Sequence, residues 1–305
     1  MPTVSIITPS YNQGRFIERT IQTVLEQDTR GRSLEYVIVD GGSTDTTADI
    51  VRRYADRLRW VSEPDGGQAD AVNKGLRSSS GEVIGWLNSD DVYYPGAISA
   101  ACELFEAHPA LDVVYGDAEH IDKNGVVLGR YPTEPFALRR LEEICYLCQP
   151  AVFFRRRVVE RFGTLDERLH LALDYEYWLR LALGGATFCY LPRVLAGWRL
   201  YPGIKSYARR LEMHVEVNHM MLERLGRVPD QWIYNYAHAR LELTGINASK
   251  HLRFAAGLAA MTLWASLRWN HSLPPTVRAT TLIWLKDGVK LLYWSLRARA
   301  RARLR

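Results

Sequence analysis

The sequence has few cysteines, no apolar stretch of membrane-spanning length and no phosphate-binding glycine motif. Four cysteines among 305 residues do not make a disulfide framework, and Cys145 and Cys148 lack the second pair that a structural zinc site needs. The apolar stretch at residues 254–267 is shorter than the ~20 residues of a full span. Neither a P-loop nor the three-glycine dinucleotide fingerprint is present. Met1 leads directly into a strand pattern, so we also expect no secretory signal.

What the chain does have is ample core-forming material and an uneven charge. Hydrophobic residues make up 47% and charged residues 24%, which suits one large or two small globular domains. Residues 1–204 hold 22 lysines and arginines against 28 acids, whereas residues 205–305 hold 17 against 6. The basic second part predicts an anionic partner. Because no base-reading module is visible, we expect a membrane surface and not nucleic acid.

The first hundred residues alternate short β-branched runs with segments of helical spacing. The predicted strands cover residues 4–8, 34–39, 60–62 and 83–87. Each is followed by a loop and, in most cases, by apolar residues three and four apart, as in Phe16, Ile17, Ile21 and Val24. This alternation predicts an α/β fold with a doubly wound, mostly parallel sheet.

Acidic residues stand where two of these strands end. Asp40 closes the second run, and Asp90 and Asp91 follow the fourth. Since βαβ crossovers place all carboxyl ends on one side of the sheet, we expect these acids along one edge. Paired carboxylates on a rigid element suit Mg²⁺ or Mn²⁺, although a polar turn would also explain them. Ser43 and Asp45, after Gly41-Gly42, are explained equally well as helix caps or as ligand-binding residues.

Four motifs in order resemble the large inverting glycosyltransferase family 2. They are VSIITPSYN at residues 4–12, DGGSTDT at 40–46, NKG at 73–75 and NSDD at 88–91. The resemblance covers about residues 3–205 and implies a glycosyltransferase-A fold. It divides the chain into a catalytic domain at 1–205, with a nucleotide-binding half at about 1–100 and an acceptor half at 101–205. A basic, mostly helical region follows at 206–305.

The resemblance implies a nucleotide-sugar site built from these motifs. Pro9 and Tyr11 would line the base pocket, and Asp40 would accept a hydrogen bond from a nucleobase ring nitrogen, most often of uracil. Asp65 and Asp70 would lie near the base, the ribose or the sugar. The implied nucleotide- and substrate-binding set is Pro9, Tyr11, Asp40, Gly42, Ser43, Asp65, Asp70, Lys74, Asn88, Ser89 and Asp91.

Asn88-Ser89-Asp90 matches the family's metal-binding Asp-x-Asp. Asp90 is the implied principal ligand of Mg²⁺ or Mn²⁺, and Asp91 is a neighbour that would reach the ribose or the metal. Asn88 departs from the aspartate at the first position of this pattern. Its amide oxygen can still bind a metal but adds no negative charge beside Asp90.

A second chemical stretch surrounds Asp174, at the start of a predicted helix. A carboxylate there can stabilise the helix dipole, or it can act as a general base toward a sugar hydroxyl. The resemblance favours the base, although Leu173 replaces the usual Glu, and Glu176 is the second candidate. Further on, Tyr201 stands where the family often has His. Tyr201, Arg199 or Lys205 would then bind the diphosphate, unless this segment is a surface loop.

We therefore predict a metal-dependent inverting glycosyltransferase that moves a sugar, most often UDP-linked, to a saccharide or lipid-linked acceptor in cell-surface polysaccharide synthesis. Aromatic-rich segments at 254–267 and 282–296, with the arginines of 297–305, would bind the inner face of the cell membrane from the cytoplasm. A helical subdomain packed on the core is the alternative. A sugar nucleotidyltransferase is less expected, because Pro9-Ser10-Tyr11-Asn12 is not a glycine-rich loop. A non-catalytic nucleotide- or sugar-binding module stays open. The Arg155-Arg156-Arg157 run is interpreted as a solvated face.

Overall fold

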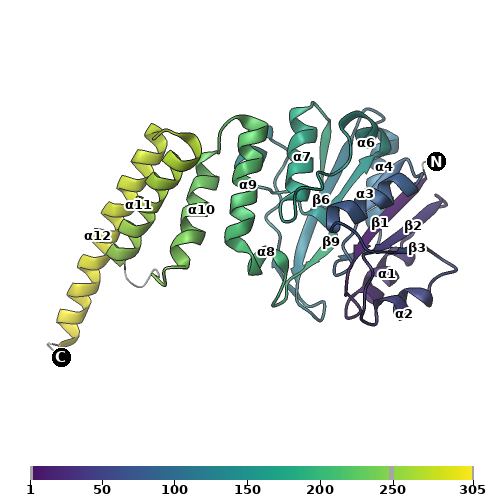
Figure 1. The fold of residues 1–305 in the computed structure, drawn as a ribbon, viewed down its shortest axis with the longest axis horizontal. Coiled ribbons are helices and arrows are strands. Elements are labelled where there is room, and N and C mark those ends of the chain that lie inside the picture. The colour runs from purple at the N-terminus through teal and green to yellow at the C-terminus, as the bar shows by residue number, and fades with distance from the viewer. Residues whose placement is uncertain (1–2, 247–250, 304–305) are drawn as a thin grey trace. The chain divides into compact units, whose positions relative to one another are not determined.

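A computed structural model describes residues 3–246 and 251–303 of the chain. The chain forms two compact units, Met1–Ile204 and Lys205–Arg305. The first contains a nine-stranded sheet with helices, and the second is helical (Figure 1). Each unit is described in turn.

The first four strands in spatial order form the parallel half of the sheet. They are β3 (Arg59–Ser62), β2 (Leu34–Asp40), β1 (Val4–Ser10) and β4 (Val83–Trp86). All three ladders between them are parallel, as the sequence predicts. The β1–β2 register pairs Ser10 with Asp40, so the loops after these two strands leave the sheet side by side.

Beyond β4 the sheet becomes mixed. Four further strands continue it in the order β8 (Val152–Arg155), β6 (Val113–Ile121), β9 (Phe188–Arg199) and β5 (Val92–Tyr93). Only the β6–β9 ladder among these is parallel. β7 (Val127–Arg130) pairs with β6 in the hairpin that Asn124-Gly125 predicts, and Gly125 has the positive φ of 88° such a turn needs.

The helices of the first unit follow the strands in βαβ fashion. They are α1 (Ile17–Leu25), α2 (Thr47–Arg52), α3 (Gln68–Ser78), α4 (Ala97–Ala107), α5 (Leu138–Glu143), α6 (Arg156–Phe162) and α7 (Leu173–Leu183), with a 3₁₀ turn η1 at Gln149–Ala151. In α1 the buried residues include Ile17, Ile21 and Val24, the spacing that directs one face at the sheet.

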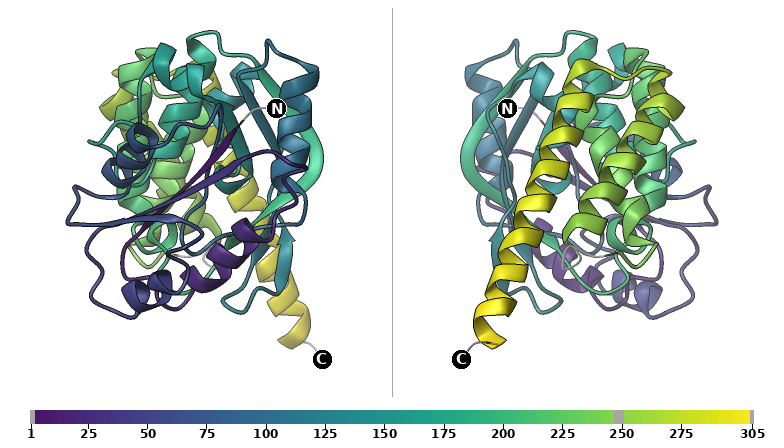
Figure 2. Two further views of the ribbon diagram at one scale, coloured as in Figure 1. Left: turned by 90° about the vertical axis from the view of Figure 1, so that its right-hand side faces the viewer. Right: turned by 90° about the vertical axis from the view of Figure 1, so that its left-hand side faces the viewer.

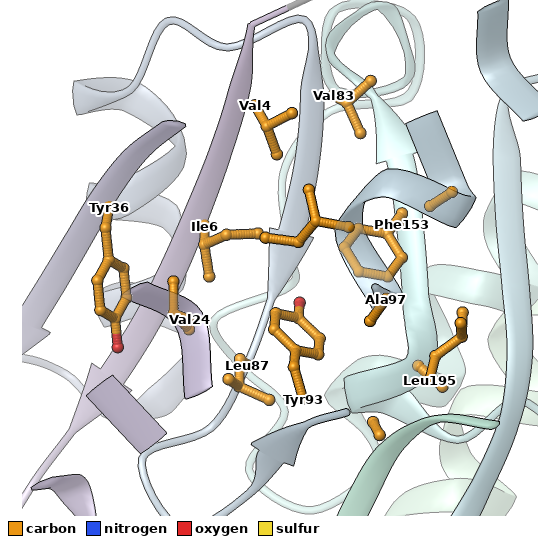
Figure 3. Packing of buried hydrophobic residues seen from close by; sticks show 14 of the residues in the cluster. Val4, Ile6, Val24, Tyr36, Val83, Leu87, Tyr93, Ala97, Phe153 and Leu195 are labelled. Carbon is orange, nitrogen blue, oxygen red and sulfur yellow. The ribbon is translucent and has the colours of Figure 1, made fainter. Parts of the chain in front are cut away.

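The core of the first unit is centred on β1 and β4 (Figure 3). Ile6 and Phe153 are fully buried, and the Tyr93 ring stacks on Phe153 at 5.4 Å between centroids. Gly85 lies among all three: a Cβ there would stand 2.7 Å from the Ile6 side chain and 2.6 Å from the Tyr93 hydroxyl. The close packing of these aromatic and aliphatic groups therefore requires glycine at position 85.

The interpretation of the arginine run at 155–157 as a solvated face was wrong for Arg155, which is buried, whereas Arg156 is half-buried and Arg157 is exposed. Arg155 is only 8% exposed and donates hydrogen bonds to the backbone oxygens of Leu111 and Phe105. Arg156 and Arg157 likewise donate to backbone carbonyl oxygens. The guanidinium groups donate to backbone carbonyl oxygens, and the last carbonyl oxygens of a helix have no hydrogen-bond partner within the helix itself. The run of charges in the sequence does not by itself reveal this role.

The second unit is built from helices, the last two of which run side by side (Figure 2). The helices are α8 (Lys205–Ala208), α9 (Arg210–Leu225), α10 (Asp230–Glu242), α11 (His251–Asn270) and α12 (Pro275–Arg303). Asn270 at the end of α11 exchanges two hydrogen bonds with Val228, which fixes it to the α9–α10 turn. Within the described ranges, none of the helices is both long and apolar enough for a transmembrane span.

Candidate functional site

Asp40, the last residue of β2, is completely buried at the carboxyl edge of the sheet. Its carboxylate accepts hydrogen bonds from the Ser43 backbone N–H at 3.0 Å, from the Ser43 hydroxyl and from the Ser62 hydroxyl at 2.7 Å. Three donors stabilise a buried charge that would otherwise be costly. The expected contact of Asp40 with a nucleobase stays a prediction. Its carboxylate already fixes the loop after β2.

The loop after β1 is joined to the loop after β2. Asn12 has a left-handed backbone, with φ of 52°, and its N–H donates to the Ser43 hydroxyl at 2.7 Å. Its side-chain oxygen accepts from the Thr44 N–H at 2.9 Å. Pro9 is buried within β1, whereas Tyr11 is 61% exposed beside this junction. An exposed aromatic ring next to two rigid loops can stack on a base, which is the predicted role of Tyr11.

Asp65 lies in the loop before α3, and Asp70 and Lys74 lie in the first turns of that helix. The Asp65 carboxylate lies over Gly41, where an added Cβ would come within 2.7 Å of it, and it accepts from the Gly67 N–H at 2.9 Å. Asp70 accepts from the Gly66 N–H at 2.9 Å, and this bond first of all lowers its pKa. The Lys74 ammonium lies 3.3 Å from Asp70. These residues shape the loop that would face the donor, and Gly42, with φ of 80°, completes the turn after β2.

The segment after β4 presents Asp90 at the site. Asp90 is half-buried, and its Oδ2 accepts a hydrogen bond from the Tyr201 hydroxyl at 2.9 Å. The backbone below it is held from two sides. The Thr20 hydroxyl donates to the Ser89 and Asp91 carbonyl oxygens at 3.0 and 2.7 Å, and Arg199 Nε donates to the Asp90 carbonyl oxygen at 2.6 Å. Asp90 therefore lies on a short loop whose backbone is held by hydrogen bonds from Thr20 and Arg199.

Asp91 lies deeper than Asp90, with only 1% of its surface exposed. Its Oδ1 accepts from the Arg199 backbone N–H at 2.9 Å, and its Oδ2 accepts from the Asn88 side chain at 3.4 Å. Burial, and then the charge of Asp90, raises the pKa of Asp91 well above its usual range. Its proposed contact with metal or ribose stays a prediction, and the buried position suits a role in holding the loop better.

Arg199, the last residue of β9, supplies the positive charge beneath these acids. It is 3% exposed, and its guanidinium also donates to the Asp122 carbonyl oxygen at 2.9 Å and lies over the Phe16 ring at 4.9 Å. Burial lowers the pKa of Arg199, and Asp91 and Asp90 oppose that effect. Such burial suits Arg199 to supporting the Asp90 loop more than to binding a diphosphate directly, the role suggested from the sequence. Lys205 belongs to the second unit.

Asp174 begins α7 and is partly exposed. Burial raises the pKa of the Cys148 thiol, and Asp91, Cys145 and Asp174 raise it further. Burial likewise raises the pKa of the Cys145 thiol. Among the described residues, no group of three His, Cys, Asp or Glu side chains is arranged to hold a metal.

Glu176, the second candidate base, is only 1% exposed. Its carboxylate forms an ion pair with Arg180 at 2.8 Å, one helical turn further along α7. Arg180 also donates to the backbone oxygens of Phe162 and Thr164. Glu176 therefore anchors α7 in the interior, and of the two acids Asp174 is the more exposed.

Sequence reasoning missed several residues that hold the site together. They are Thr20, Gln68, Trp86 and Gln149, all of them hydrogen-bonded to the segment Asn88–Asp91 or to each other. The available signal was weak: Gln149 is a polar residue beside Pro150 in an otherwise apolar run, and it turns out to be 7% exposed. A glutamine within an apolar run is expected to be buried, and a buried glutamine needs hydrogen-bond partners. This position could therefore have pointed to a polar network.

The fold and the acids at the carboxyl edge define a protein of the glycosyltransferase-A type. The structure of TarS from S. aureus in complex with UDP-GlcNAc is similar to this chain, with 17% sequence identity and a TM-score of 0.63. The match covers 97% of this chain and 92% of the TarS chain. The mannosyltransferase PcManGT from Pyrobaculum calidifontis, in complex with GDP-Man and Mn²⁺, has 21% identity and a TM-score of 0.59, covering 97% and 86%. At these identities the likeness shows the fold.

Sequence comparison then gives the family. Residues 5–163, more than half of the chain, match the model of Glycosyl transferase family 2. Chondroitin synthase from Escherichia coli is 31% identical over 234 residues, which cover 74% of this chain and 33% of that protein. The chain thus spans about a third of the length of this relative. The protein belongs to glycosyl transferase family 2, and the predicted family, fold and enzyme class are confirmed.

Proposed function

We propose that the protein transfers a sugar, with inversion, from a UDP-linked donor to a saccharide or lipid-linked saccharide in cell-surface polysaccharide synthesis. The observation that supports the proposal is the position of two acids at the carboxyl edge of the parallel strands: Asp40 ends β2, and Asp90 follows β4. Asp174 lies near the start of α7 and is partly exposed, as a general base must be. Family membership favours this reading over a nucleotidyltransferase or a non-catalytic binding module.

The residues present fit a Mg²⁺ or Mn²⁺ ion that shares its ligands with the donor. Asp90 offers a half-buried carboxylate on a clamped loop, and Mg²⁺ is commonly held by one or two carboxylates together with substrate phosphates. When bound, the ion would neutralise negative charge that develops on the departing nucleoside diphosphate. Asp90 would be its main protein ligand.

The reaction would be a single displacement at the anomeric carbon. Asp174 takes the proton from the acceptor hydroxyl as its oxygen bonds to that carbon. The bond from the carbon to the diphosphate oxygen breaks at the same time, and its electron pair leaves with the nucleoside diphosphate. Attack from the face opposite the leaving group inverts the configuration. Thr20 and Arg199 keep the Asp90 loop in place, and Tyr201 orients the Asp90 carboxylate.

Nucleotide binding tests the donor assignment. The melting temperature is measured with UDP, GDP and dTDP, each with and without Mn²⁺. We expect the largest rise with UDP, and a further rise when Mn²⁺ is added, because binding to the folded state alone stabilises it. A larger response to GDP would show that the donor carries guanine and not uracil. Guanine is the main alternative because the PcManGT structure is a complex with GDP-Man. No response to any nucleotide would count against the function itself.

We further propose that the second unit binds the anionic inner surface of the cell membrane, with the protein in the cytoplasm. On α12, Leu282, Val289 and Tyr293 recur at intervals of seven and four residues and therefore share a face. Their exposed fractions are 57%, 55% and 51%. Lys286 lies exposed between them. Apolar and aromatic side chains beside lysines suit the headgroup layer of an acidic bilayer. The arginine side chains of 297–305 lie outside the described residues.

Vesicle sedimentation tests this partner. We expect the protein to pellet with phosphatidylglycerol vesicles and much less with phosphatidylcholine vesicles at low salt. The double substitution L282E/V289E should remove this difference, whereas L128E, at an exposed leucine of the first unit, should preserve it. Equal recovery of the wild-type protein in the supernatant with both vesicles would refute membrane binding by this face.

A further inference from the structure

The side chain of Asn88 is the centre of a hydrogen-bond network beneath Asp90. Its Oδ1 accepts from Gln68 Nε2 at 2.7 Å and from Trp86 Nε1 at 2.9 Å. Its Nδ2 donates to Gln149 Oε1 at 2.8 Å and to Asp91 Oδ2 at 3.4 Å. Both ends of the amide are therefore engaged by protein groups.

The chemistry of the partners fixes which way this amide points. An indole N–H can only donate, so the Asn88 atom that faces Trp86 must be the oxygen. The nitrogen then faces Gln149, which presents its oxygen because its own Nε2 donates to the Trp86 carbonyl oxygen. The site thus presents donors on one side of position 88 and acceptors on the other. Among the side chains of this size, only the amide of asparagine matches both.

The network connects parts of the first unit that the chain keeps far apart. Gln68 is the first residue of α3 on the donor side, Trp86 ends β4, and Gln149 opens η1, which leads into the acceptor half. Gln149 closes a ring by donating its own Nε2 to the Trp86 carbonyl oxygen. Trp86, Gln149 and Asp91 are 2%, 7% and 1% exposed. A buried network with every partner satisfied sets a single geometry, and partial loss is costly.

We propose that Asn88 is a positioning residue and not a metal ligand. It holds the Asp90–Asp91 loop in register with α3 and η1, so that Asp90 faces the donor diphosphate while the acceptor half stays aligned. This inference deepens the proposed function and rests on it for the role of Asp90. A carboxylate at position 88 would not improve the metal site, because it would face the acceptor atoms of Asp91 and Gln149.

The substitution Asn88→Asp separates the two roles. The control is Asn124→Asp, the same change at an exposed turn residue of the β6–β7 hairpin. The dissociation constant of Mn²⁺ is measured by calorimetry in the presence of saturating UDP, and kcat and the donor KM are measured on UDP-sugars. We expect Asn88→Asp to leave Mn²⁺ binding no tighter than in the wild type. We expect kcat to fall about tenfold or more while the donor KM changes much less, because misplaced catalytic groups slow the chemical step.

A variant that binds Mn²⁺ several-fold more tightly, or that retains wild-type kcat, would overturn the proposal. A second measurement keeps the proposal testable without turnover. The melting temperatures of Asn88→Ala, Gln149→Ala and the double variant form a cycle. We expect the double variant to melt no lower than the worse single variant, since either change breaks the same network. Additive losses would refute the network even in an active enzyme. If the falls in melting temperature are coupled but the protein transfers no sugar, the network is supported and the proposed function is refuted.

Discussion

The two units of the protein differ in whether they bury charged side chains. In the first unit, the buried carboxylates Asp40 and Asp91 each accept hydrogen bonds from neighbouring donors, and Glu176 is paired with Arg180. Among the described residues of the second unit, the buried polar side chains include no carboxylate, and His214, Asn218 and Thr262 have atoms without hydrogen-bond partners. Buried atoms without partners also occur in the described part of the first unit, where all of them belong to neutral side chains.

In the first unit, Asp40 and Asp91 fix the loops after β2 and β4, and Glu176 fixes α7, so removing one of these charges should cost stability or activity. In the second unit, the buried Ser266 and Thr281 are hydrogen-bonded, but both ring nitrogens of His214 lack partners among the described residues, so removing His214 should cost nothing. Substitutions that exchange a polar group for an uncharged or apolar one therefore test the contrast directly.

The largest stability effect is expected for Glu176→Gln in the first unit. Removing one partner of a buried ion pair leaves the other charge uncompensated, which typically costs about 3–5 kcal/mol. Because Arg180 keeps its bonds to backbone oxygens, we expect a value near the lower end, about 3 kcal/mol. Urea unfolding at neutral pH provides the measurement. A loss below about 1 kcal/mol, the level of a surface pair, would break the contrast between the units.

An opposite, smaller effect is expected for His214→Leu in the second unit. Both ring nitrogens of His214 lack partners among the described residues, and the side chain is 4% exposed. Replacing an unsatisfied buried polar group with an apolar one should stabilise the protein by about 1–2 kcal/mol at pH 7. Thermal unfolding of the wild type and the variant would measure the gain, and a clear loss of stability would show that His214 has a partner in solution.

The same residue predicts a dependence on pH. Burial lowers the pKa of His214 to about 4, with Arg210 lowering it further and Glu242 opposing. Between this value and the ordinary 6.5, the unfolded chain binds more protons than the folded chain, so stability falls as the pH drops through this window. The loss should approach about 3 kcal/mol at most. His214→Leu should remove this part of the pH dependence, and an unchanged profile would exclude His214 as its source.

Local sequence patterns predicted the half of the sheet that runs β3-β2-β1-β4, because each strand is a short apolar run that ends in a polar loop. They did not reveal β9, since Pro192 interrupts its residues and proline argues against a central strand. The structure accommodates it at an irregularity: the β6–β9 register moves from Gly116↔Leu191 to Asp117↔Val194, which leaves Pro192 outside the ladder.

The acids of the site were visible in the sequence because acids at strand ends and a helix start are local features. Their partners were not, because hydrogen bonds join Arg199 to Asp90 and Gln149 to Asn88 across more than sixty residues of chain. Asp91 illustrates the limit. Adjacent in sequence to Asp90, it is buried while Asp90 is half-exposed, because β9 lies against Asp91 and Arg199 donates its backbone N–H to it.

The measurement that tests the account most directly is sugar transfer by Asp174→Asn at saturating donor, with UDP and Mn²⁺ binding measured in parallel. A general base contributes about 10²–10⁴-fold to the rate, so we expect kcat to fall by that factor while nucleotide binding and melting temperature stay near wild-type values. The neutral amide still suits a helix start, which keeps the fold intact. Transfer at the wild-type rate by Asp174→Asn would contradict the claim that this carboxylate deprotonates the acceptor.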